Sequence, residues 1–173
     1  MKKFLVVVLV LAAGAYVYLI SLGIHRNVAV ENGEQGGMLL VGNHHVGPYY
    51  TIGNVFEELQ TFNPSGEFVG VFFDDPEVVP DDSCRSFAGW IVPSTAAGLE
   101  LMGQHQHLRL LPIERRQSVY CDWEGGNMLG ILIGTFKAYP ALGLAAEAQG
   151  WTGETVIAYE HYHEGQTRFV MQY

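Results

Sequence analysis

The stretch HHVGPYYTIGNVFEELQ, residues 44–60, connects an apolar run to an amphipathic segment through a Gly-Pro turn. The preceding residues MLLVGNHH, 38–45, are typical of a strand. After the turn, four apolar side chains recur at helical spacing: Ile52, Val55, Phe56 and Leu59. EFVGVFFDD, residues 67–75, and FAGWIVP, residues 87–93, then predict two further strands. This half of the chain is therefore predicted to fold as strand, helix, strand and strand.

The second half of the chain has the same predicted order. Its strand, helix and two closing strands are expected at residues 107–124, 125–150, 154–165 and 166–173. Because Pro140 lacks a backbone N–H, we expect it to kink or restart the helix. Duplicated strand-helix-strand-strand units, at about residues 38–93 and 106–173, predict an α+β fold with a mainly antiparallel sheet. We expect the helices on one face of this sheet and a ligand cleft on the other.

The N-terminal segment predicts a membrane helix. Residues 4–24 carry no charge, and about 20 apolar residues span the hydrocarbon core of a bilayer. We therefore expect residues 1–26 to be an uncleaved single-pass anchor and residues 27–37 a linker or weak strand. The alternative is a signal peptide cleaved before Tyr16. The N-terminal lysines outnumber Arg26 on the other side of the span, which favours an extracytoplasmic domain.

Composition narrows the range of partners. The 173 residues carry a formal net charge of −9 and are 49% hydrophobic and 16% charged, which is typical of a globular protein. An acidic chain is a poor binder of nucleic acid, which needs clustered lysine and arginine; cationic or neutral ligands suit it better. Cys84 and Cys121 are too few for a disulfide scaffold, although they could form one bridge in an oxidising compartment. We expect no cofactor.

Three blocks occur in order along the chain: HHVGPYYTIGNVFEEL (44–59), VFFDDPEVVPDDSCRSFAGWIV (71–92) and AYPALGLAAEAQGWTGETVIAYEHY (138–162). They contain a His-x-Gly-Pro-Tyr turn, an Asp-Asp-Pro after the second strand and a late Glu-x-Tyr strand. These blocks resemble the GyrI-like small-molecule-binding family, which also supplies effector-binding domains of AraC-type and MerR-type regulators. The resemblance covers about residues 38–173. Together with the apolar span, it is similar to a membrane-anchored branch that includes an autophagy receptor of the endoplasmic reticulum.

The resemblance implies a ligand cleft between the two halves, with a glutamate on the late strand that corresponds to Glu160. Alternation in IAYEHY places Ala158, Glu160 and Tyr162 on one face of the strand. We expect the opposite face, with Tyr159, to pack on the helices. A desolvated carboxylate is costly unless a cation pairs with it, and aromatic rings add cation–π attraction. The predicted ligand-binding residues are Glu160, Tyr162, Trp90, Trp123, Tyr120, Phe72, His45 and Tyr49.

The sequence thus predicts a membrane-anchored domain that binds a small amphipathic molecule, aromatic or cationic, in a cleft. One alternative is a hydrolase of an electrophilic small molecule, with Glu160 and Tyr162 in acid–base roles. Another is a membrane-tethered scaffold or adaptor, whose protein partner the sequence leaves unknown. We expect no metal site, because His44 and His45 point to opposite faces of a strand and the pair His161 and His163 supplies only two ligands.

Overall fold

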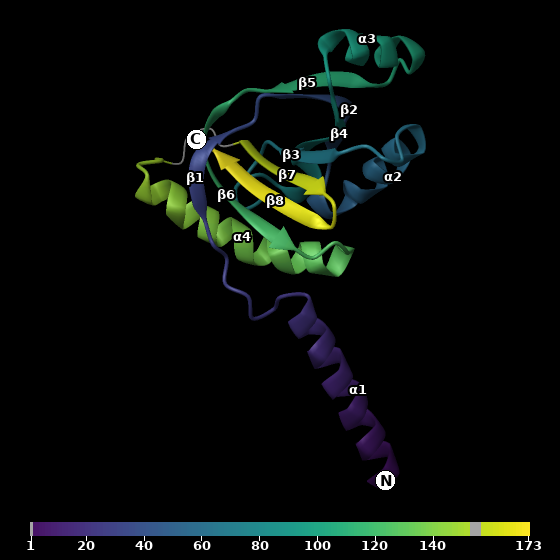
Figure 1. Cartoon of the computed structure of the whole chain (residues 1–173), viewed down its shortest axis with the longest axis vertical. Helices are drawn as coiled ribbons and strands as arrows, with labels where there is room; N and C mark the ends of the chain where they lie inside the picture. Colours follow the sequence, from purple (N-terminus) through teal and green to yellow (C-terminus); the bar gives the residue numbers. More distant parts are fainter. Residues whose placement is uncertain (1, 153–156) are drawn as a thin grey trace.

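The computed structural model describes residues 2–152 and 157–173, and Figure 1 shows the arrangement of its elements. Within this part, the helices and strands are α1 (Lys2–Ser21), β1 (Glu31–Gln35), β2 (Met38–Val46), α2 (Gly53–Phe62), β3 (Phe68–Phe72), β4 (Arg85–Val92), α3 (Thr95–Gln104), β5 (Arg109–Ile113), β6 (Arg116–Glu124), α4 (Met128–Ala148), β7 (Ile157–His163) and β8 (Gln166–Gln172). Two single 3₁₀ turns lie at Tyr49–Thr51 and Asp81–Ser83.

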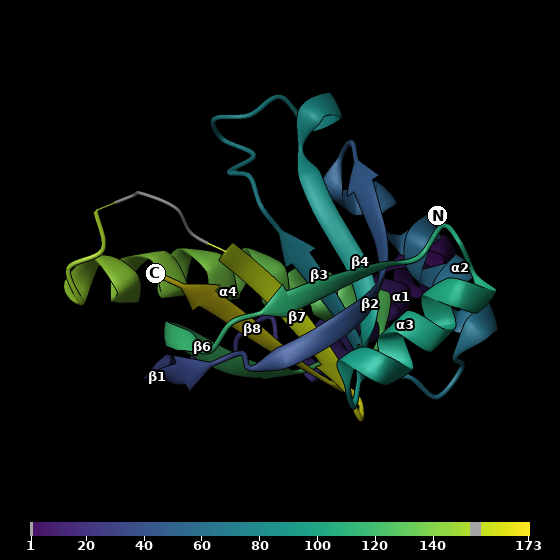
Figure 2. The same ribbon diagram turned by 90° about the horizontal axis from the view of Figure 1, so that it is seen from above.

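The strands of this part form one antiparallel sheet in the order β1-β6-β8-β7-β3-β4-β2-β5. The predicted α+β class and antiparallel pairing are confirmed. Strands β3 and β7 lie side by side at the centre, with β4 and β2 on one flank and β8 and β6 on the other. Seen from above, the sheet is strongly curled (Figure 2). Two equivalent strand-helix-strand-strand units would produce this strand order, but the duplication of such a unit in this chain stays a prediction.

Local sequence explains where the elements turn. The two-residue loop Glu164-Gly165 joins β7 to β8, and both residues have positive φ, at 44° and 80°. A tight hairpin of this kind matches the twist of its strands and fixes their register. The helix α3 begins where the Ser94 hydroxyl accepts a hydrogen bond from the Ala97 N–H at 3.2 Å. In α4 the side chain of Asn127 caps the first turn in the same way.

The two faces of the sheet carry separate apolar clusters. On the helix-covered face, α2 and α3 pack over β2, β3 and β4, and α4 packs over β6 and β8. The residues of the opposite cluster that the structure describes lie on or beside strands: Leu40, Val69, Val71, Phe87, Ile113, Tyr159 and Val170. The curled sheet therefore wraps around this second cluster with its own side chains.

Three expectations about the elements need correction. Tyr159 lies in the strand-built cluster, whereas Glu160 and Tyr162 face α4 and α2, so the helices cover the face opposite to the expected one. The helix α4 runs without a break through Pro140, and the expected restart is absent. Residues 107–124, expected as one strand, form two strands, β5 and β6, which pair with β2 and β8 respectively.

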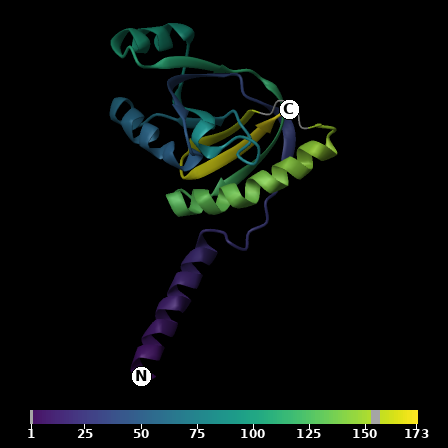
Figure 3. The same ribbon diagram turned by 180° about the vertical axis from the view of Figure 1, so that it is seen from behind.

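The apolar helix α1 projects from the domain (Figures 1 and 3). Among the described residues, α1 and α4 are the helices long and apolar enough to cross a bilayer, judged by length and composition alone. A signal sequence or a core helix meets the same criterion, and α4 is packed on the sheet. An N-terminal apolar helix is therefore present, and its insertion in a membrane stays a prediction.

Candidate functional site

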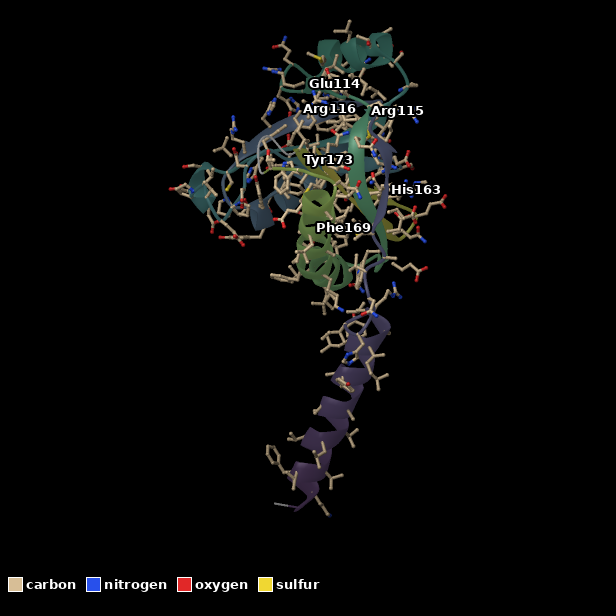
Figure 4. The ribbon with its side chains drawn as sticks, turned by 90° about the vertical axis from the view of Figure 1, so that its left-hand side faces the viewer. Glu114, Arg115, Arg116, His163, Phe169 and Tyr173 are labelled. Carbon is tan, nitrogen blue, oxygen red and sulfur yellow. The ribbon has the colours of Figure 1, made fainter. Side chains whose placement is uncertain are left out.

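The candidate site is built around Glu160, in the middle of the central strand β7. Its backbone pairs with Gly70 on β3 and with Phe169 on β8, and only 5% of the residue is exposed. The Tyr162 hydroxyl donates to Glu160 Oε2 at 2.6 Å, and the Tyr139 hydroxyl donates to Oε1 at 3.1 Å. Tyr162 comes from the same strand, whereas Tyr139 reaches the carboxylate from α4. Phe169, the partner of Glu160 on β8, also lies beside α4 (Figure 4).

The electrostatics of this group are those of a carboxylate with neutral partners. Burial raises the pKa of Glu160 above its usual value, and the hydrogen bonds from Tyr162 and Tyr139 partly oppose this rise. Burial and the neighbouring carboxylate also raise the pKa of both tyrosines well above 10, so they remain donors. Within residues 2–152 and 157–173, no lysine, arginine or histidine forms an ion pair with Glu160. The charged form of Glu160 is therefore desolvated, and within these residues it is stabilised by hydrogen bonds but by no ion pair.

Aromatic rings surround the carboxylate on the helix side. Phe56 on α2 meets Tyr162 edge to face, with ring centroids 5.4 Å apart. Gly70, directly beside Glu160 in the sheet, has no side chain, and a Cβ there would lie 3.3 Å from Phe56 and 3.4 Å from Phe72. Tyr49 contacts Phe72 at a centroid distance of 4.9 Å. The missing Cβ thus leaves room for these rings over the centre of the sheet.

Two shallow hollows meet at Tyr162. The first has a volume of about 300 Å³ and is lined by Ser65, Gly66, Glu67, Tyr162, His163 and Glu164. The second, of about 180 Å³, lies between the start of α4 and the β7–β8 hairpin, and Gly126, Ile131 and Thr167 belong to its lining. Tyr162 contributes to the lining of both hollows, and Glu160 to neither. The ligand cleft that the sequence predicted on the helix-free face stays a prediction.

The predicted residues Tyr162, Phe72 and Tyr49 are brought together with Glu160. The Tyr49 ring contacts Phe72, and its hydroxyl donates to the carbonyl oxygens of Asp74 and Arg85 at 2.7 and 3.2 Å. Burial raises the pKa of Tyr49 to about 12. This tyrosine fixes the loop after β3 against the start of β4.

Trp90 and His45 lie on the same face but farther from the carboxylate. Trp90 is buried against Phe68, whose ring contacts Phe56, so it connects to the site only through a row of rings. His45 Nε2 hydrogen-bonds to the Thr51 hydroxyl at 2.8 Å. That contact fixes the turn that precedes α2.

Trp123 and Tyr120 are not brought to Glu160. Trp123 is buried beneath α4, where its indole N–H donates to the Gly130 carbonyl at 2.9 Å. Tyr120 lies on the opposite face, donates to Glu31 at 2.8 Å and stacks under Arg168. Both residues are on β6 and alternate in direction, so at most one could share a face with Glu160.

Sequence reasoning missed Tyr139 and Phe56 as members of the site. Both lie on helices, 21 and more than 100 residues from Glu160 in sequence, and periodicity marked them only as helical. A buried tyrosine hydroxyl needs a hydrogen-bond partner, so the position of Tyr139 inside an apolar helix is the signal that could have found it.

Potential metal ligands are arranged for other contacts. Among the described residues, no group of three or more His, Cys, Asp or Glu side chains could hold a metal ion. His161 and His163 both face Glu67, with N–O distances of 3.1 and 2.8 Å. Cys84 and Cys121 are buried free thiols.

No family model matches the sequence, and no curated protein matches it. Solved structures are similar to the fold. An integron cassette protein from Vibrio cholerae has a TM-score of 0.53 at 11% identity, covering 84% of this chain and 97% of that chain. SAV2435 bound to tetraphenylphosphonium gives 0.53 at 10% identity, covering 83% and 93% of the two chains. The EcmrR C-terminal domain gives 0.53 at 12% identity over 84% and 96%. These similarities are consistent with the effector-binding fold implied by the sequence resemblance.

Proposed function

We propose that this protein is a membrane-anchored receptor for an amphipathic small cation with aromatic groups, which pairs with Glu160. The observation that carries the proposal is the buried carboxylate held by two tyrosine hydroxyls. A carboxylate has about four lone-pair sites, and the tyrosines occupy two. An apolar cation would compensate the charge without requiring a second buried polar group.

The aromatic surroundings support the same class of ligand. The rings of Phe56, Phe72 and Tyr162 crowd around Gly70, and they would provide apolar contact and cation–π attraction to a cation that displaces one of them. Tyr162 belongs to the lining of both hollows, and we propose that its ring moves aside there to admit the ligand. A similar fold binds tetraphenylphosphonium in SAV2435, which makes this cation the natural first probe.

The membrane anchor is the second part of the proposal. Helix α1 is 20 residues long, and its apolar side chains are exposed along its length. An exposed apolar helix of this length matches the thickness of a bilayer. The extracytoplasmic location of the domain is proposed from the lysines at the N-terminus, and the acidic net charge supports a partner other than nucleic acid.

The test is a titration of the full chain with tetraphenylphosphonium and with tetraphenylborate, which has the same shape and the opposite charge. We expect the phosphonium to raise the unfolding temperature and the borate to have no effect, because only the cation pairs with Glu160. In Glu160→Gln, phosphonium affinity should fall about 10- to 150-fold, because the charge–charge contact is lost; a contact with a charged group contributes about 1.5 to 3 kcal/mol. Tyr120→Phe, on the other face, is the matched control and should bind normally.

Three outcomes would contradict the proposal. Equal binding of both ions would show that shape alone is recognised. Turnover of an ester or electrophile that Glu160→Gln abolishes would establish the hydrolase alternative. No stabilisation by either ion, together with a reproducible protein partner, would favour the scaffold.

A further inference from the structure

Helix α4 presents its large apolar side chains to the outside and its small ones to the sheet. The buried stripe consists of Gly130, Gly134, Ala138, Leu142 and Ala146. The outward stripe, also at intervals of four residues, consists of Met128, Leu132, Phe136, Pro140 and Leu144. Phe136 is 74% exposed, Met128 83% and Leu144 70%. A surface helix normally has the reverse arrangement, so the outward stripe requires a cover.

Helix α4 lies at the end of the domain from which α1 projects (Figures 1 and 3). It crosses this end of the domain, and the sheet lies on its other side. The buried stripe faces the sheet, as the packing of Gly134 against Trp123 shows. The outward stripe therefore points to the side toward which α1 extends.

The junction between α1 and the domain is made of direct contacts. The Asn127 side-chain amide donates to the Tyr18 hydroxyl at 3.3 Å. The Lys137 ammonium donates to the Arg26 carbonyl at 2.7 Å. Arg26 pairs with Glu124 at 3.3 Å and stacks on Trp123. These contacts connect the end of α1 and the middle of the α1–β1 connection to α4 and β6, so α1 and α4 have a defined relative position.

The same contacts determine how far α4 would lie from a bilayer that α1 crosses. Tyrosine is enriched where a membrane helix crosses the interface between hydrocarbon and headgroups. Tyr16 and Tyr18 stand in the last turns of α1 and are half exposed, at 53% and 50%. Since Asn127 contacts Tyr18 and immediately precedes α4, a bilayer crossed by α1 would have the start of α4 at the level of this interface.

The distribution of charged residues along the chain agrees with a position of α4 beside the membrane. The chain has 18 acidic residues, yet residues 125–146 contain none, and Lys137 is the one charged residue among them. The charged turn Glu114, Arg115 and Arg116 lies at the end of the domain remote from α1 (Figure 4). An acid-free apolar surface avoids the cost of bringing a carboxylate to a membrane.

We propose that the outward stripe of α4 lies in the interface of the same bilayer that α1 crosses, so that the domain rests on the membrane in one orientation. This inference rests on the membrane anchor of the proposed function, but not on the ligand site. Interfacial helices bury their apolar face about 5 to 10 Å into the boundary between headgroups and acyl chains. Phe136 and Leu132 would occupy this layer.

The experiment places a fluorescent label on the full chain in phosphatidylcholine vesicles and uses lipids that carry a quencher at shallow or deep positions. Single cysteines are introduced as Phe136→Cys, Leu9→Cys and, for comparison, Leu99→Cys. Leu99 is a 57% exposed leucine on α3, at the end of the domain away from α1. The native thiols are buried, and labelling of the unmodified chain gives the background.

We expect the label at position 136 to be quenched most by the shallow quencher, the label at position 9 by the deep one, and the label at position 99 by neither. Quenching at 9 without quenching at 136 would overturn the inference and leave the anchor intact. Energy transfer between labels at 136 in place of lipid quenching would assign the stripe to a second copy of the chain. Absence of quenching at both positions would overturn anchor and inference together. Tetraphenylphosphonium binding by the same labelled protein reports the ligand site independently.

Discussion

The hydroxyl of Tyr162 provides the most direct test of the buried charge. In Tyr162→Phe the ring remains and the 2.6 Å hydrogen bond to Glu160 is lost. A hydrogen bond to a charged group contributes about 1.5 to 3 kcal/mol, against about 0.5 to 1.5 kcal/mol for a neutral pair. For a domain of this size, the larger loss lowers the unfolding temperature by about 3 to 12 °C. The loss should be measured by thermal unfolding of the full chain in detergent micelles.

The pH dependence of the stability lost in Tyr162→Phe shows whether the lost hydrogen bond was made to a charged Glu160. The Tyr162 hydrogen bond lowers the pKa of Glu160 because it favours the charged form. Removing this hydrogen bond raises the pKa of Glu160 further. The destabilisation of Tyr162→Phe is therefore largest at pH values above the Glu160 pKa, and it becomes smaller as the pH falls below that pKa. In a Glu160→Gln background the same substitution should have a small effect at every pH. Tyr120→Phe removes a similar bond to an exposed carboxylate, that of Glu31, and should change little. A loss in Tyr162→Phe that is equal at all pH values would refute the charged contact.

Other expected outcomes concern the pH profile and three glycines. The pKa of Glu160 in the folded state is raised above 4.5. The stability of the wild-type protein should therefore decrease as the pH rises from 4.5 through the folded pKa, and should then become constant. Urea unfolding of Glu160→Gln should show no such decrease. Gly134→Ala places a Cβ 2.7 Å from Trp123 and should destabilise by about 1 to 3 kcal/mol. Gly143→Ala, in open space on the same helix, should stabilise by up to about 1 kcal/mol in the same assay. Gly70→Val should abolish tetraphenylphosphonium binding in a calorimetric titration while the pH profile persists, because its side chain would press on the Phe56 and Phe72 rings that are proposed to contact the cation.

The ligand affinity should also depend on pH. A cation binds the charged form of Glu160, so its affinity should increase as the pH rises through the folded pKa and become constant above it. Binding below that pKa should release a proton, which titrations in buffers of different ionisation enthalpy detect. A cation affinity that does not change as the pH rises through the folded pKa of Glu160, as located by the stability profile, would contradict the pairing.

Most elements were predictable because short patterns specify them. The helical spacing in residues 52–59 predicted α2, whose bounds are Gly53–Phe62. The alternation of IAYEHY correctly placed Glu160 and Tyr162 on one face, since a strand has a period of two. The restart expected at Pro140 is absent, because the penalty of one missing hydrogen bond is outweighed by the packing of α4 on β6 and β8.

The amino-acid sequence by itself determined the strand and helix types, the antiparallel α+β class, the apolar N-terminal helix and the pairing of Glu160 with Tyr162. These features depend on residues that are neighbours in the chain. Only the tertiary structure decided which face of β7 receives the helices, because both faces are apolar and the choice rests on how α2 and α4 pack across distant strands. For the same reason it decided that Tyr139 reaches Glu160 and that Trp123 does not. The position of a side chain along its own helix is local information, whereas the partner it meets depends on the assembled sheet.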